Sequence, residues 1–70
     1  MSEDLNTLAE RSNIVHALEP GFISCTADDK SLYFAFDSAL NAEQFKFKRE
    51  LEGSAFPMIV DGSTVIETRS

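Results

Sequence analysis

The chain has 70 residues, a formal net charge of −6, one cysteine and one histidine. One cysteine excludes an internal disulfide, and these two side chains fall short of the four ligands of a structural zinc site. The negative charge disfavours binding to nucleic-acid phosphates and to anionic membrane surfaces. No apolar run approaches the roughly 20 residues of a membrane span. We expect one small acidic domain over residues 1–70, with no cofactor and no metal.

The N-terminal residues are acidic and polar, which is not the pattern of a secretory signal, so we expect a cytoplasmic protein. The first predicted element is a helix with Ser2 as N-cap and Glu3 and Asp4 in the first turn. Pro20-Gly21 ends it, and Ser12-Asn13 is an alternative break. The stripe expected to face the core consists of Leu5, Leu8, Val15 and Leu18, with Ala9 and Ile14 at its edges.

Residues 22–27 and 32–36 are predicted strands, and the turn-forming residues between them favour a hairpin. Because strand side chains alternate, Leu32, Phe34 and Phe36 share one face. Cys25 lies within the first of these strands and is interpreted as a core residue.

The second predicted helix begins after Asp37 or Ser38, with a later start at Asn41 as the alternative, and ends near Gly53. At about 100° per residue, one apolar stripe gathers within about 40° and is expected to face the core. Phe45 points nearly opposite, beside Arg49, and is expected to be half-exposed. The predicted core stripe consists of Leu40, Phe47 and Leu51.

The last predicted element is a hairpin over residues 56–66, with Asp61-Gly62 as a type I′ turn. This register places Val60 opposite Ser63 and Ile59 opposite Thr64. Pro57 has no N–H to donate, so its strand is expected at a sheet edge. One face of the hairpin carries Phe56, Met58, Val60 and Val65, and the other carries Ile59 and Ile66.

The segment from Phe56-Pro57 through Asp61-Gly62 to Glu67-Thr68 resembles the Pro-strand-turn-strand segment of glutathione transferases and other thioredoxin-like domains. The resemblance implies a cis proline beside a thiol-binding site. However, Glu67 comes one position earlier than in that family, and a C-x-x-C or catalytic Ser/Tyr on a first βα unit is absent. We interpret the likeness as convergence on a hairpin.

The predicted order is α-β-β-α-β-β, an α+β fold with a four-stranded antiparallel sheet and two helices packed on one face. A Cys25–His16 nucleophile pair would lack a third group to orient it. The run Phe45-Lys46-Phe47-Lys48-Arg49 mixes aromatic and basic residues, as in single-strand binders. On a helix, however, its two aromatic rings point about 200° apart and form no common platform. No catalytic residue is predicted.

A non-enzymatic interaction module therefore fits best: a regulator, adaptor or inhibitor of another protein, of the kind common among small accessory and viral gene products. Its partner would be another protein or a second copy of the chain, met through an apolar sheet face or an edge strand. The alternative is an acidic inhibitor that mimics nucleic acid, and the least favoured reading is a thiol-dependent redox fragment. The predicted partner-binding residues are Phe45, Arg49, Ile59, Thr64 and Ile66.

Overall fold

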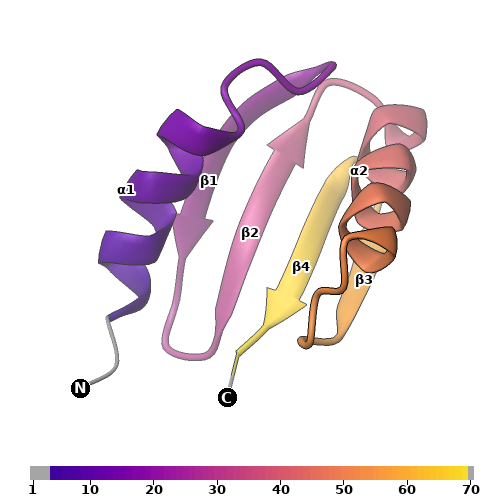
Figure 1. Ribbon diagram of the computed structural model, residues 1–70. Helices are drawn as coiled ribbons and strands as arrows, with labels where there is room; N and C mark the ends of the chain where they lie inside the picture. Colours follow the sequence, from indigo (N-terminus) through magenta and orange to yellow (C-terminus); the bar gives the residue numbers. More distant parts are fainter. Residues whose placement is uncertain (1–3, 70) are drawn as a thin grey trace.

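The computed structural model describes residues 4–69. Its four strands form one antiparallel sheet in the order β1-β2-β4-β3, and both helices pack on the same face (Figure 1). This confirms the predicted α+β fold in element order, strand pairing and layering. The elements are α1 (Leu5–Val15), β1 (Phe22–Ala27), β2 (Ser31–Phe36), α2 (Ala39–Leu51), β3 (Met58–Asp61) and β4 (Thr64–Thr68).

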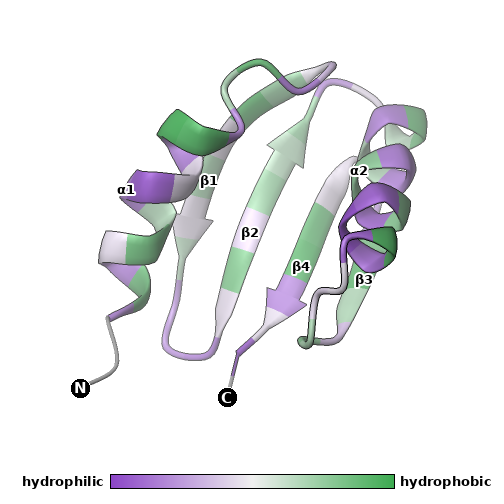
Figure 2. Ribbon diagram, viewed as in Figure 1, coloured by the Kyte–Doolittle hydropathy of each residue, from purple (hydrophilic) through white to green (hydrophobic). Residues whose placement is uncertain are grey.

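The core lies between the helices and the alternate residues of the central strands. Leu32, Phe34 and Phe36 of β2 share one face, as predicted, and this face points toward the helices and is buried. On β4 the same face carries Val65 and then Glu67, so the strand changes from apolar to polar along its length (Figure 2). A fully buried carboxylate therefore lies beside an aromatic core.

Helix α1 begins two residues later than predicted. Asp4 is the N-cap, and its carboxylate accepts a hydrogen bond from the Thr7 N–H at 3.0 Å, while Ser2 and Glu3 lie outside the described residues. The helix continues through Ser12-Asn13 and ends at Val15.

The predicted core stripe of α1 is only half correct. Leu5 and Leu8 pack against the core and Ala9 is buried, but Val15, Leu18 and the stripe-edge residue Ile14 are exposed. The inward side of the helix continues instead through Asn13 to His16, which is buried after the last turn. The chain then turns, so Leu18 no longer shares the helical phase of the first turns.

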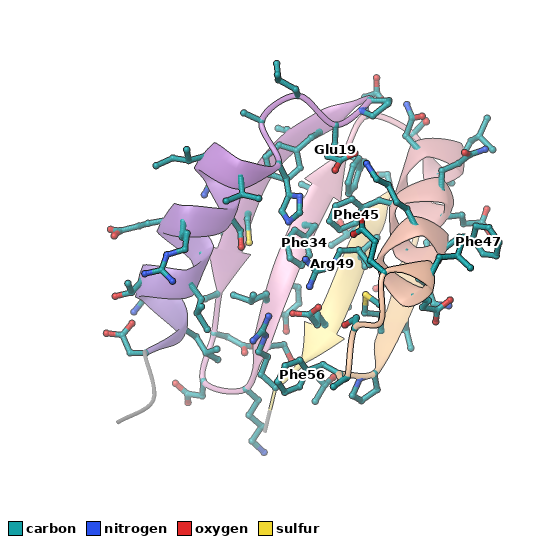
Figure 3. The ribbon with its side chains drawn as sticks, viewed as in Figure 1. Glu19, Phe34, Phe45, Phe47, Arg49 and Phe56 are labelled. Carbon is teal, nitrogen blue, oxygen red and sulfur yellow. The ribbon has the colours of Figure 1, made fainter. Side chains whose placement is uncertain are left out.

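Helix α2 starts early, as predicted, with Ser38 as N-cap to the Asn41 N–H. Its predicted phase is wrong: Phe45 is 4% exposed and Phe47 is 62% exposed. Figure 3 shows Phe45 pointing to the middle of the molecule, toward Phe34, and Phe47 pointing away from it. The small, fully buried Ala42 lets α2 approach the sheet closely on this side.

The pairing of Arg49 with Glu67 explains which face of α2 turns toward the sheet. Arg49 lies about 40° from Phe45 on the helical wheel, and it pairs with the buried Glu67. An unpaired buried carboxylate is strongly destabilising, so the face that carries Arg49 turns inward. The larger apolar stripe of Leu40, Phe47 and Leu51 is left facing solvent.

The last hairpin forms with a shifted register. Its turn residues are Gly62-Ser63, so Val60 pairs with Val65 and Ile59 with Ile66. Within this turn only Gly62 has a positive φ, as a type II′ turn requires. The predicted type I′ turn needs a positive φ at both turn residues. The predicted faces of Met58, Val60, Ile59 and Ile66 are nevertheless correct.

Strand β3 lies at a sheet edge, which confirms the expectation from Pro57. The described residues contain no cis peptide bond, so Pro57 lacks the conformation that the thioredoxin-like resemblance implied.

Candidate functional site

A chain of paired polar side chains crosses the helix-covered face of the sheet. At its centre, Glu67 accepts hydrogen bonds from Arg49 of α2 and from Arg69 Nε, the latter at 2.7 Å. Glu67 is 0% exposed, and the two guanidinium groups together satisfy both of its oxygens. The guanidinium of Arg49 also lies 5.7 Å from the ring centre of Phe34. These contacts fix α2 to β4.

His16 extends this chain of polar groups to the end of α1. Nη1 of Arg49 lies 3.2 Å from Nε2 of His16, and since arginine only donates, Nε2 accepts. The neutral imidazole then carries its proton on Nδ1, which lies 3.5 Å from Glu19. Burial and the charge of Arg49 lower the pKa of His16 below its usual value.

Glu19 is in turn held by Lys48 of α2, whose Nζ lies 3.0 Å from one carboxylate oxygen. Although burial alone would raise the pKa of Glu19, the hydrogen bond and charge of Lys48 lower it. The polar chain thus connects the turn after α1, helix α2 and strand β4. Among the described residues, no group of three or more His, Cys, Asp and Glu is placed to hold a metal ion.

Cys25 is buried on β1, as the sequence predicted. Burial raises the pKa of its thiol to about 11, which leaves little thiolate at neutral pH. The backbone N–H and C=O of Cys25 are both hydrogen-bonded to the side-chain amide of Asn13, which joins β1 to α1.

A groove lies between α2 and the turn that follows α1. Its cavity volume is about 280 Å³, and its lining includes Pro20, Phe36, Gln44, Phe47, Lys48 and Leu51; we call it the α2 groove. Phe36 and Phe45 form part of its wall, and Pro20 and two members of the exposed apolar stripe, Phe47 and Leu51, complete its apolar lining. The hydrogen-bonded pair of Glu19 and Lys48 also borders it. An aromatic hollow with a few polar groups is the usual form of a binding pocket.

The second candidate surface is the sheet face turned away from the helices, which we call the open face. Tyr33 pairs with both Thr26 and Ile66, and Ile59 also lies opposite Ile66. Uncharged side chains therefore cross all four strands, although a quarter of the chain is charged. The residues of the open face include Ser24, Thr26, Tyr33, Ala35, Ile59, Thr64 and Ile66, with Asp61 at the end of β3.

The five predicted partner-binding residues separate into two groups on opposite sides of the sheet. Ile59, Thr64 and Ile66 share the open face, and their role in binding stays a prediction. Phe45 is buried rather than half-exposed as predicted, although it also lines the α2 groove. Arg49 is hydrogen-bonded to Glu67 and His16. The role of both residues in binding stays a prediction.

The sequence analysis missed Glu67 and the exposed stripe of α2. Glu67 occurs in phase with Val65, so an acid at a core-facing strand position was a signal that a buried cation accompanies it. Asn13 was considered only as part of an alternative helix break at Ser12-Asn13, and nothing in the sequence indicated its bonds to β1.

Comparison with protein-family models, with curated proteins and with solved structures gave no match to this chain. Among residues 4–69, neither helix has the length and apolar character needed to cross a membrane.

Proposed function

We propose that this chain is a non-enzymatic interaction module, which acts as a regulator, adaptor or inhibitor of another protein by binding it through the α2 groove. The observation that carries the proposal is the exposure of Leu40, Phe47 and Leu51 on one helix beside an aromatic cavity. A helix that carries apolar side chains on two opposite faces is normally packed against other protein on both faces. Exposed apolar patches of this kind mark interaction sites.

The partner we propose carries a large apolar side chain flanked by basic residues. The cavity of about 280 Å³ accommodates one such side chain. The net charge of −6 attracts a basic segment over long range and so favours encounter.

A crosslinking experiment identifies the partner and tests the groove. A photoreactive phenylalanine analogue at position 47 captures the protein that occupies the groove in an extract of the source cells. Binding of the purified partner is then measured with Phe47→Ala and with Ile23→Ala as the control. Phe47 and Ile23 are matched, at 62% and 63% exposed, but Ile23 lies on β1.

We expect Phe47→Ala to weaken binding by at least about tenfold, or about 1.4 kcal/mol, and Ile23→Ala to leave it within about twofold of the wild type. Equal affinities for Phe47→Ala and the wild type would remove the α2 groove as the binding site.

The nucleic-acid mimic has weaker support. Such a mimic needs many carboxylates in a regular array, and this chain has only a modest excess of acidic residues, with a net charge of −6.

A further inference from the structure

The two edges of the sheet differ in how their backbone groups are satisfied. On β1, Asn13 Nδ2 donates to the Cys25 carbonyl at 2.8 Å, and the Cys25 N–H donates to Asn13 Oδ1 at 2.9 Å. The amide of Asn13 therefore takes the place of a neighbouring strand at the middle of this edge. Unpaired strand edges are templates for pairing with another chain, and this one is blocked.

Strand β3 forms the other edge, and its outward groups follow from its pairing with β4. The Thr68 N–H donates to the Pro57 carbonyl at 2.9 Å. Because bonded pairs alternate in an antiparallel ladder, Ile59 and Asp61 also bond to β4. Met58 and Val60 therefore direct their N–H and C=O groups away from the sheet.

We propose that β3 is the interface for a second copy of this chain, paired antiparallel about a two-fold axis at Ile59. In this register Met58 faces Val60 of the second copy, and Val60 faces its Met58. Every outward N–H and C=O of these two residues then gains a partner. The two Ile59 side chains meet as a non-hydrogen-bonded pair, with Cα atoms about 4.5 Å apart.

The ends and faces of β3 fit a copy of the same strand. Pro57 lies opposite Asp61 of the second copy at each end, and Pro57, which has no N–H, ends the ladder symmetrically. Met58 and Val60 place apolar side chains on the helix-covered face, and Ile59 places one on the open face. No lysine and no bulge protects this strand, although both are common protections of sheet edges.

This interface is separate from the α2 groove, so the proposal does not rest on the proposed function. The groove lies between α2 and the turn after α1, and none of the residues that line it belongs to β3. A four-residue strand buries less than the about 800 Å² per partner of a standard interface. We therefore expect a weak dimer that forms with increasing concentration.

Disulfide crosslinking of purified protein tests the register, in a Cys25→Ala background. Ile59→Cys places two thiols within the Cα separation of about 4.4–6.8 Å that a disulfide requires. Asp61→Cys places its thiols about 14 Å apart, because each is displaced two residues from the axis. We expect rapid formation of a covalent dimer with Ile59→Cys and slow formation with Asp61→Cys.

Sedimentation up to about 1 mM, where even weak complexes are populated, tests the dimer without crosslinks. Ile59→Lys places like charges opposite each other and is expected to abolish the dimer, while Ile23→Lys on β1 preserves it. Circular dichroism checks that both variants fold. A wild-type monomer at the highest concentration, or equal crosslinking from positions 59 and 61, would overturn the proposal.

Discussion

Single residues of the polar chain hold the elements of this small fold together. Glu67 lacks access to water and depends on Arg49 and Arg69, and Arg49 in turn occupies Nε2 of His16. His16 also packs its ring edge-on against Phe45, with ring centres 5.0 Å apart. One imidazole therefore contributes both to the aromatic core and to the polar chain.

His16 makes stability depend on pH. The pKa of His16 is lowered in the folded state by burial and by Arg49, against the raising effects of Glu19 and Glu52. The unfolded chain therefore binds the proton first, and stability decreases as pH falls below about 6.5. The lowered pKa of Glu19 adds a second loss, as pH falls below its ordinary value of 4.5.

Denaturant unfolding between about pH 5 and pH 7 measures this effect, and His16→Phe is the matched variant because it keeps the ring packing. We expect the free energy of unfolding of the wild type to fall toward pH 5 and that of His16→Phe to change less. Equal slopes would show that His16 is not the titrating group.

At the scale of the elements, the phase of α2 is the feature with the largest consequence. Phe45 contacts three other rings, those of His16, Phe34 and Phe36, whereas Phe47 lies outside the core. Phe45→Ala is expected to lower the free energy of unfolding by about 3–5 kcal/mol. Phe47→Ala is expected to change it by less than about 0.5 kcal/mol.

Urea unfolding of the two variants compares the same substitution two positions apart on one helix. A larger loss with Phe47→Ala than with Phe45→Ala would contradict the orientation of α2.

Helix caps, apolar spacing, strand alternation and turn residues were sufficient to predict the type and order of the elements. The shared face of Leu32, Phe34 and Phe36 follows from their spacing alone, and the edge position of β3 follows from Pro57. The orientation of α2 was not predictable from its own residues, because the wheel has apolar side chains on two sides. The orientation depends on Glu67, which is distant in sequence. Of the predicted site residues, Ile59, Thr64 and Ile66 share the open face, and their role in binding stays a prediction.

At the scale of the whole molecule, the net charge of −6 acts on the two proposed contacts in opposite directions. Two copies repel each other, whereas a basic partner is attracted. Salt shortens the screening length from about 30 Å at 0.01 M to about 3 Å at 1 M. We therefore expect added sodium chloride to strengthen the dimer and to weaken partner binding, with dissociation constants measured by sedimentation and by titration of the purified partner. A dimer that weakens with salt would contradict pairing through β3, in which Asp61 lies opposite Pro57 of the second copy and not opposite a cation.

The amide of Asn13 has a consequence for how far such assembly extends. Strand-to-strand addition that joins unlike edges repeats without limit and yields fibres. In the proposed dimer one side of the molecule accepts a neighbour, and the middle of the other edge is closed by a side chain from its own helix. Growth then stops after one step, and the protein avoids the polymer that two free edges would allow.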